Sequence, residues 1–168
     1  MVPNVKEQVY NEIIVLDHSS LFLASTDTVV GLGGPISQAN HQLICQLKKR
    51  SPEKPLVVMV GSYQQARQFP EWSVQAEKFA RKIWPGPYTL VLSDNLALRM
   101  PAHLQLLNLI KKIGPVYMTS ANLAGQPPLN FEQARAAFPS VRKHYYFGKG
   151  SGRPSTVIRL SDKKVLRE

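Results

Sequence analysis

Residues 88–119, YTLVLSDNLALRMPAHLQLLNLIKKIGPVYMT, hold the pattern that decides the fold. They predict a strand, a turn, a second strand, a helix and a third strand, in that order, at residues 88–92, 94–95, 96–100, 102–113 and 116–119. Asp94 and Asn95 are turn formers between two apolar runs, which is typical of a hairpin. The helix has apolar residues at helical spacing and is followed by Gly114, a residue type that often ends helices. Strands that alternate with helices in this way favour an α/β or α+β domain.

The same mixture of elements extends along the chain in both directions. We expect further helices at residues 5–14, 38–47, 62–69, 73–83 and 131–138. Further strands are expected at residues 21–24, 56–60, 145–147, 156–160 and 164–167. Because the last strands have no helices between them, the sheet is predicted to be mixed rather than purely parallel.

Length, charge and cysteine content narrow the class of protein. The chain has 168 residues, which suits a single domain over residues 1–168. Its 21 Lys and Arg residues against 11 Asp and Glu residues give a net charge of +10, which attracts phosphates but is also compatible with a merely solvated basic surface. Cys45 is the only cysteine, which excludes a disulfide framework and a cysteine zinc site. No apolar run is long enough for a membrane span and no signal-peptide pattern occurs, so we expect a cytoplasmic protein with no membrane partner.

Familiar catalytic motifs are missing from the sequence. It contains no P-loop, no GxGxxG and no HExxH, and its four histidines are scattered. Few carboxylates fall in loops, so the sequence offers few candidates for a mechanism that uses paired acidic residues. Cations, hydroxyls and glycines are the groups that the loops do supply. These groups suit the binding of anions and the stabilisation of developing negative charge.

Four segments concentrate these groups: STDTVVGLGG at 25–34, KKRSPEKP at 48–55, WPGPYTLVL at 84–92 and MTSANLAGQPP at 118–128. Glycines in the first segment allow the backbone to approach a ligand, and the cations of the second crowd into a loop, where an anion would relieve their repulsion. The third segment is expected to be an architectural corner. Polar side chains in the fourth follow a strand end, where α/β sheets commonly bind ligands. The first, second and fourth segments also have ordinary structural interpretations, as a polar turn, a solvated helix end and a capping turn.

Taken together and in this order, the segments resemble the YrdC/TsaC family, the threonylcarbamoyl-AMP synthases. The family's motifs occur as STDTVVGLG at 25–33, KKR at 48–50, WPGPYTLVL at 84–92, RMP at 99–101, TSANLAG at 119–125, STV at 155–157 and LR at 166–167. The resemblance therefore spans nearly the whole chain. Ser25 and Val30 stand where the family has proline and tyrosine, and Ala124 and Asn130 replace its usual serine and threonine.

The resemblance implies a YrdC-like fold, with a twisted mixed sheet flanked by helices around a basic concave cavity. It implies a nucleotidyltransferase that converts L-threonine, bicarbonate or CO2 and ATP into L-threonylcarbamoyladenylate and pyrophosphate. The product supplies the threonylcarbamoyl group of t6A, the modified adenosine beside the anticodon of ANN-decoding tRNAs, and separate threonylcarbamoyl-transferase proteins transfer this group to the tRNA. Mg2+ is expected on the triphosphate, with Asp27 as a candidate ligand, and the basic surface could attract tRNA directly.

Carried over residue by residue, the resemblance also implies site residues. Lys48 and Arg50 are the catalytic candidates. The candidates for ATP binding are Arg50, Lys54, Ser120, Asn122 and Arg167. The candidates for threonine binding are Thr28, Arg99 and Ser155. Lys49, the middle residue of the KxR signature, is expected to face solvent.

Two other functions are compatible with parts of the sequence. The net charge would also suit an RNA-binding YrdC-like paralogue without synthase activity, although the aromatic residues show no regular stacking pattern. A carbamoyl-adenylate chemistry like that of the hydrogenase-maturation carbamoyltransferases is the third hypothesis. Those proteins are far longer and carry cysteine-rich zinc motifs, which a chain with one cysteine lacks.

Overall fold

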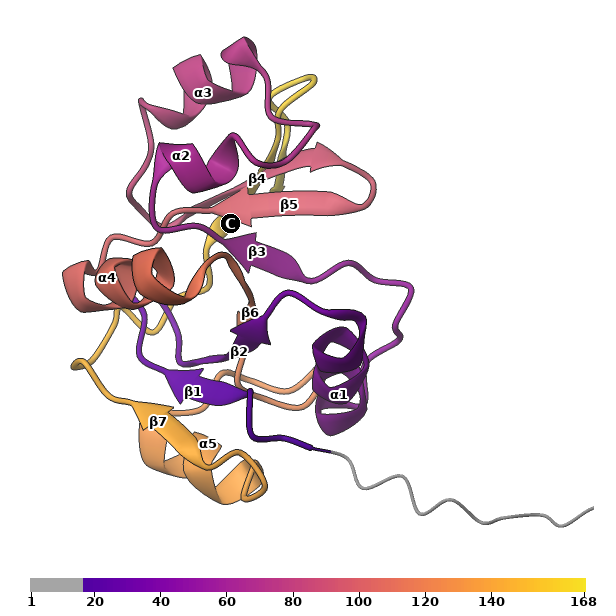
Figure 1. Ribbon diagram of the computed structural model, residues 1–168, viewed down its shortest axis with the longest axis vertical. Helices are drawn as coiled ribbons and strands as arrows, with labels where there is room; N and C mark the ends of the chain where they lie inside the picture. Colours follow the sequence, from indigo (N-terminus) through magenta and orange to yellow (C-terminus); the bar gives the residue numbers. More distant parts are fainter. Residues whose placement is uncertain (1–16) are drawn as a thin grey trace, which may run out of the picture.

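The structure is a computed structural model that describes residues 17–168, so the helix expected at 5–14 lies outside the described residues. Within residues 17–168, nine strands form one sheet in the order β7-β1-β2-β6-β3-β5-β4-β8-β9. The pairs β1–β7, β3–β5 and β4–β8 are parallel, and the remaining neighbours are antiparallel. The prediction of a mixed sheet flanked by helices is confirmed (Figure 1).

The elements follow the predicted order, with ends that differ by a few residues. The strands are β1 (Phe22–Ala24), β2 (Gly31–Pro35), β3 (Val57–Met59), β4 (Tyr88–Ser93), β5 (Leu96–Arg99), β6 (Val116–Ser120), β7 (Lys143–Tyr145), β8 (Thr156–Arg159) and β9 (Val165–Arg167). The helices are α1 (Gln38–Lys48), α2 (Tyr63–Ala66), α3 (Val74–Ala80), α4 (Leu104–Ile113) and α5 (Phe131–Ala137). Among these residues, no helix combines the length and the apolar character that a membrane span requires.

Local sequence signals explain where the helices begin and end. The Ser62 and Ser73 hydroxyls accept hydrogen bonds from backbone N–H groups of the first turns of α2 and α3, at 3.2 and 3.0 Å. Gly114 ends α4 with a φ of 93°, a conformation that costs glycine little. These helix ends are therefore fixed by residues next to them in the sequence.

Strand β2 was not expected, because its glycine-rich sequence was interpreted as a place where the backbone approaches a ligand. In the sheet, Gly31 lies opposite Ser120 and Gly33 opposite Met118. A Cβ atom on Gly31 would overlap the Met118 sulfur, and one on Gly33 would meet both Met118 and the Tyr117 carbonyl. The two glycines thus make room for a neighbouring strand's side chain and backbone, and Gly31 also lines the cavity described below.

Strand β7 lies two residues earlier than the expected strand at 145–147. Its parallel register with β1 pairs Ala24 with Tyr145, and the Ser25 N–H then donates to the Tyr145 carbonyl at 2.9 Å. Beyond the strand, the Phe147 N–H donates to the Ser25 hydroxyl at 3.1 Å. The ladder ends where a side chain takes over as the acceptor, which the aromatic run alone does not reveal.

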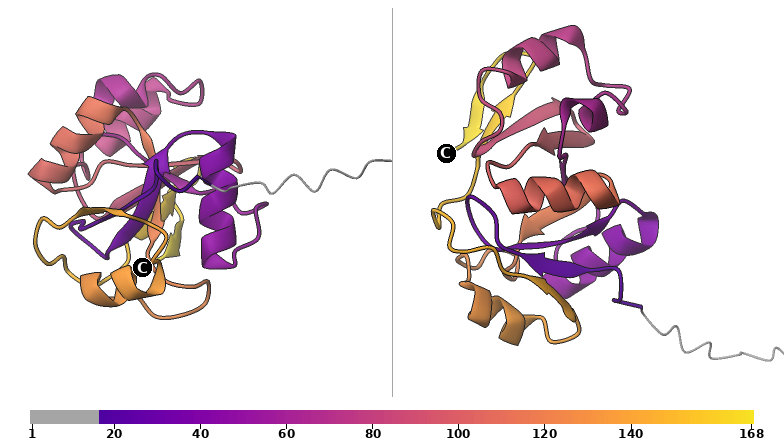
Figure 2. Two further views of the ribbon diagram at one scale, coloured as in Figure 1. Left: turned by 60° about the horizontal axis from the view of Figure 1, so that its bottom comes forward. Right: turned by 60° about the vertical axis from the view of Figure 1, so that its left-hand side comes forward.

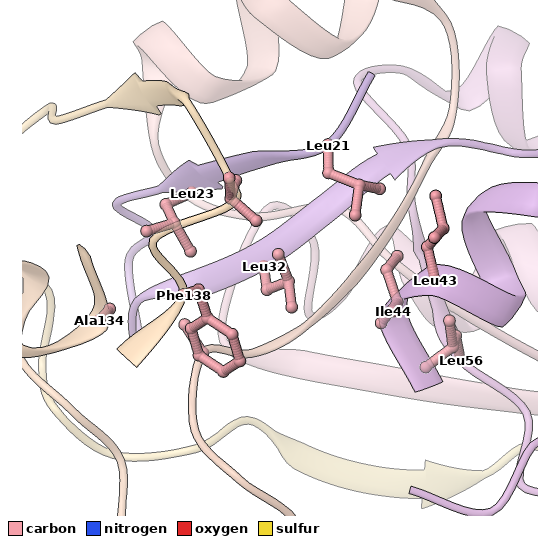
Figure 3. Close-up of a cluster of buried hydrophobic side chains, with 10 residues drawn as sticks. Leu21, Leu23, Leu32, Leu43, Ile44, Leu56, Ala134 and Phe138 are labelled. Carbon is pink, nitrogen blue, oxygen red and sulfur yellow. The ribbon is translucent and has the colours of Figure 1, made fainter. Parts of the chain in front are cut away.

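Helices cover both faces of the sheet. On one face, α1 and the end of α5 pack on Leu23 and Leu32, and Figure 3 shows Leu32 between Phe138 and Ile44. On the same face, a second core joins β3, β4, β5 and β8 to the segments of α2 and α3, which lie at the opposite end of the molecule from α5 (Figures 1 and 2). Helix α4 packs on the other face through Leu106 and Ile110, against side chains of β1, β3 and β6. Because successive strand residues alternate between faces, the polar residues considered next lie on the α4 face.

Candidate active site

A cavity of about 370 Å³ lies on the α4 face of the sheet. Its floor consists of alternate residues of the central and C-terminal strands, and one wall is the loop between β1 and β2. Six of the nine side chains singled out from the sequence line it: Thr28, Arg50, Arg99, Ser120, Ser155 and Arg167. Lys48, Lys54 and Asn122 do not. Among the described residues that line this cavity, none is acidic, so its walls carry a positive charge.

Sheet register brings residues from distant parts of the chain into one row. Arg99 of β5 pairs with Thr89 of β4, Thr89 pairs with Val157 of β8, and Val157 pairs with Arg167 of β9. Two arginines that are far apart in the sequence therefore reach the same face of the sheet. Thr89 was missed, because its segment was interpreted as architectural. A polar residue at an alternate position of an otherwise apolar strand was the available signal.

Arg99 is buried and already has partners. It forms an ion pair with Asp27 and donates to the Thr28 hydroxyl at 2.9 Å and to the Gly86 carbonyl at 3.3 Å. Burial lowers the pKa of Arg99, and the neighbouring Asp27 charge opposes that shift. Arg99 lines the cavity, but Asp27 balances its charge in this structure, so the threonine contact expected of Arg99 stays a prediction.

Asp27 does not fit the expected role of a metal ligand. One of its carboxylate oxygens pairs with Arg99, and the other accepts a hydrogen bond from the Ala102 N–H at 3.0 Å. Both oxygens thus hold the β1–β2 loop against the segment that follows β5. Within the described part of the chain, no group of three His, Cys, Asp or Glu side chains is arranged to hold a metal ion.

Arg50 lies at the cavity with part of its guanidinium unused. Its Nη2 donates to the Pro55 carbonyl at 2.8 Å and lies 3.5 Å from the Lys54 carbonyl. Its Nε is buried without a hydrogen-bond partner, and Arg50 forms no ion pair within residues 17–168. Lys54 is exposed, and only its backbone takes part in this arrangement. Of the two, Arg50 is the cation positioned to meet an anion in the cavity.

Lys48 was expected in a loop, but it belongs to the last turn of α1 and is buried. Its ammonium donates to the Ser120 carbonyl and, at 2.6 Å, to the Asn122 carbonyl. Burial, reinforced by the nearby Arg50 charge, lowers the pKa of Lys48 to about 8. Helix α1 continues one residue beyond its expected end, and this single residue changes the surroundings of the side chain.

The Ser120–Asn122 segment divides between the cavity and the interior. Ser120, the last residue of β6, lines the cavity. Asn122 turns away, and its Nδ2 donates to the carbonyls of Leu123 and Gln126 at 2.9 and 2.7 Å. Its Oδ1 is buried without a partner. The Asn122 side chain therefore shapes the following turn rather than lining the cavity.

Hydroxyl groups and a second available arginine complete the lining. The Thr28 and Thr26 hydroxyls are 3.0 Å apart, and those of Ser155 and Thr89 are 2.8 Å apart. Arg167 donates to the Ser155 carbonyl at 2.9 Å and has no acidic partner in the described chain. Burial lowers the pKa of Arg167. The cavity thus combines two arginines without acidic partners and paired hydroxyls, which suits an anion with several oxygens.

A second, larger hollow of about 810 Å³ adjoins the cavity and shares Thr26, Thr28 and Val29 with it. Its walls include apolar and aromatic side chains from the start of α5 and from the segment after β7. Phe131 and Tyr146 meet edge to face there, with ring centroids 5.1 Å apart. The β1–β2 loop therefore has a cation-lined hollow on one side and a mainly apolar hollow on the other.

The structure defines an α/β protein whose mixed sheet carries a cation-lined hollow on one face, and comparison with known proteins identifies the family. A sequence model of the Sua5/YciO/YrdC family, described as "Telomere recombination", matches residues 15–168. The chain belongs to this family.

Three relatives show how the chain compares with longer proteins. It is 32% identical over 158 residues to the Mycoplasma pneumoniae "Uncharacterized protein MG259 homolog", covering 91% of this chain and 33% of the relative. It is 36% identical to a threonylcarbamoyl-AMP synthase of Pyrococcus abyssi, over 61% of this chain and 35% of the relative. It is 31% identical to a threonylcarbamoyl-AMP synthase of Klebsiella pneumoniae, over 73% of this chain and 74% of the relative. The chain thus spans about a third of the length of the first two.

Solved structures agree with this assignment. The crystal structure of P. abyssi Sua5 complexed with L-threonine superposes with a TM-score of 0.73 at 30% identity, over 84% of this chain and 47% of that one. Escherichia coli YciO superposes with a TM-score of 0.75 at 20% identity, over 89% of this chain and 83% of that one. The second likeness shows the fold alone, and together they confirm the predicted YrdC-like fold.

Proposed function

We propose that this protein is a threonylcarbamoyl-AMP synthase, which forms L-threonylcarbamoyladenylate from L-threonine, bicarbonate or CO2 and ATP. The observation that carries the proposal is the convergence of six family-motif side chains on one cavity that has no acidic lining residue among those described. Relatives that bear this name, and the P. abyssi relative whose structure holds L-threonine, support it.

The proposed chemistry asks for orientation and charge stabilisation. The threonine amine attacks CO2 to give a carbamate and a proton, and a carbamate oxygen then attacks the α-phosphorus as pyrophosphate leaves. The substrates supply both nucleophile and electrophile, so the protein contributes positioning and positive charge. Arg50 and Arg167 are proposed to hold phosphate oxygens, and the Thr28, Ser120 and Ser155 hydroxyls to orient the amino acid and the triphosphate.

The adjoining apolar hollow offers a place for the nucleoside. A nucleotide combines a flat aromatic base with a polyanionic tail. Of the two hollows that meet at residues 26–29, one is mainly apolar and would suit the base, and the other is lined by cations and would suit the phosphates. Mg2+ on the triphosphate would be held by phosphate oxygens and water, since the cavity lining offers no carboxylate and both Asp27 oxygens are in use.

The direct test is incubation with ATP, L-threonine and labelled bicarbonate, followed by detection of labelled adenylate. We expect labelled product and pyrophosphate only when all three substrates are present. Product formation without threonine, or the absence of product at every substrate concentration, contradicts the proposal.

Arg50→Ala is expected to lower kcat/KM by about 10²–10³-fold, the usual effect of losing a charge-stabilising contact. The fold should persist, because the Arg50 side chain bonds only to backbone carbonyls of the neighbouring loop. Pyrophosphate release and circular dichroism measure the two effects. Undiminished turnover would remove Arg50 from the site.

A second candidate function is RNA binding without synthase activity. It is favoured by residues 142–153, where exposed basic side chains such as Arg142 and Lys149 flank a run of three aromatic residues that includes Tyr146, which is 64% exposed. Direct attraction of tRNA would be compatible with either function, so tRNA binding alone does not decide. ATP consumption that requires threonine and bicarbonate together favours the synthase, after which separate transferase proteins would act on tRNA.

A further inference from the structure

Lys48 holds the turn after β6 through three hydrogen bonds. Its ammonium donates to the carbonyls of Ser120 and Asn122, and its own carbonyl accepts from the Ala124 N–H at 3.0 Å. The Ala121 N–H donates to the Val30 carbonyl at 2.8 Å. For residues 122–124, every hydrogen bond to a described part of the chain outside 120–126 involves Lys48. This side chain and its carbonyl therefore hold the turn to α1.

The Lys48 ammonium is not placed to contact a substrate in the cavity. Lys48 is only 2% exposed and is absent from the cavity lining, whereas Arg50, two residues later, lines the cavity. To reach a phosphate, Lys48 would have to leave the buried Asn122 carbonyl without its donor, while the Ser120 carbonyl would keep only the Asn122 N–H. Ser120, whose carbonyl it holds, does line the cavity. Lys48 can therefore affect the cavity only through the turn that it holds.

We propose that Lys48 is a positioning residue, which fixes the Ser120–Ala124 turn, and with it the Ser120 side chain, at the cavity wall without touching the triphosphate. The kinetic consequence rests on the proposed synthase function, but the structural consequence does not. Without the ammonium the turn opens, and the site loses the fixed geometry on which rate depends.

Three variants isolate this role. Lys48→Met removes the ammonium and keeps an unbranched chain, and Lys48→Gln has a side chain as long as that of methionine but ends in N–H donors. Lys49→Met removes the same charge at the exposed neighbouring position. Hydrogen exchange of the segment 120–126, compared with the β4–β5 hairpin, reports the turn in each protein. Steady-state kinetics with ATP as the varied substrate report the site.

We expect Lys48→Met to exchange the 120–126 amides about tenfold faster, with the hairpin unchanged, and Lys49→Met to match the wild type. Lys48→Gln should fall between them. In the synthase assay, kcat of Lys48→Met should drop about tenfold while the KM for ATP stays within about threefold, since no ground-state contact is lost.

Unchanged exchange at 120–126 in Lys48→Met overturns the proposal, as does a higher KM for ATP with kcat preserved. Faster exchange everywhere would also overturn it, because it would reveal a purely structural role. If Lys48→Met does not fold, the same comparison between Lys48→Gln and Lys49→Met decides. A wild-type protein that makes no adenylate would contradict the proposed function, while the exchange experiment would still decide whether Lys48 holds the turn.

Discussion

Arg99 and Lys48 are both buried cations next to the same cavity, but they have different partners. Arg99 lies against the Asp27 carboxylate, a full negative charge, and also bonds to Thr28 and Gly86. Lys48 lies against two carbonyl dipoles and close to the positive charge of Arg50. A buried cation with a counter-ion keeps its proton, whereas one that has only dipoles moves toward neutrality.

The two cations also support different walls of the cavity. Arg99 and Asp27 join the β1–β2 loop to the sheet and to the segment after β5. Lys48 joins the turn after β6 to α1. The first arrangement is a permanent ion pair within the fold, and the second depends on a group with a pKa of about 8. Loss of Arg99 should therefore lower the stability more, and Lys48 should contribute more to the pH dependence of the stability.

The largest effect is expected from Arg99→Met. It leaves the Asp27 carboxylate, whose side chain is only 12% exposed, without its counter-ion, and should lower the free energy of unfolding by about 3–5 kcal/mol. Urea denaturation measures this loss. Combining Arg99→Met with Asp27→Asn should recover part of it, because the unpaired charge is removed as well. A loss below about 1 kcal/mol would place this pair among weak surface ion pairs and end the contrast with Lys48.

Much of this comparison could be predicted from the sequence, and part of it could not. The helices, eight of the strands and the family follow from periodicity, caps and motifs, such as the Ser62 cap of α2. The meeting of Arg99 and Arg167 depends on the parallel pairing of β4 with β8. Pairings between distant strands leave no local pattern, so only the family resemblance indicated that these two arginines belong to one site.

Local patterns also missed features that depend on a single residue. Glycine is unfavourable in strands, so β2 could not be expected without knowing that Met118 occupies the space beside Gly31. Whether Lys48 is buried depends on α1 continuing one residue further, with Lys49 in the left-handed conformation at a φ of 52°. Helix ends are the least certain part of a sequence-based prediction, and here one end decides which lysine faces solvent.

Gly150→Ala tests the β1–β2 loop, which Arg99 contacts through Asp27 and Thr28 and which Gly150 contacts through the Thr26 and Thr28 carbonyls. A Cβ atom there would overlap the carbonyls of Thr28 and Thr26, while Gly152 donates to the Thr28 carbonyl at 2.9 Å. We expect about 1–3 kcal/mol of destabilisation, since backbone atoms have little room to move. Activity should fall as well, because Thr28 lines the cavity. Gly148→Ala, where a Cβ meets nothing within 4 Å but φ is 108°, separates backbone strain from the overlap.

The pH dependence of stability sharpens the contrast at Lys48. Its pKa is about 8 in the folded protein and near 10.5 when unfolded, so the unfolded chain binds more protons between these values. Stability relative to Lys48→Met should therefore rise with pH from about 8 to 10, by about 1 kcal/mol after allowance for solvent screening, and stay flat below pH 7. When both proteins are denatured with urea at the same pH values, the contributions of the other titrating groups cancel in the difference between them. A difference that falls with pH would contradict a buried cation stabilised only by dipoles.

The smallest effect is expected from Lys49→Ala, one residue beyond Lys48. Lys49 is exposed and caps α1 through its backbone, so its side chain should contribute less than about 0.5 kcal/mol, with turnover unchanged. Denaturation and pyrophosphate release measure both. Since this variant loses the same formal charge as Lys48→Met, equal losses of activity in the two would mean that net charge near the cavity matters more than position. Unequal losses would leave burial against the turn as the property that distinguishes the two lysines.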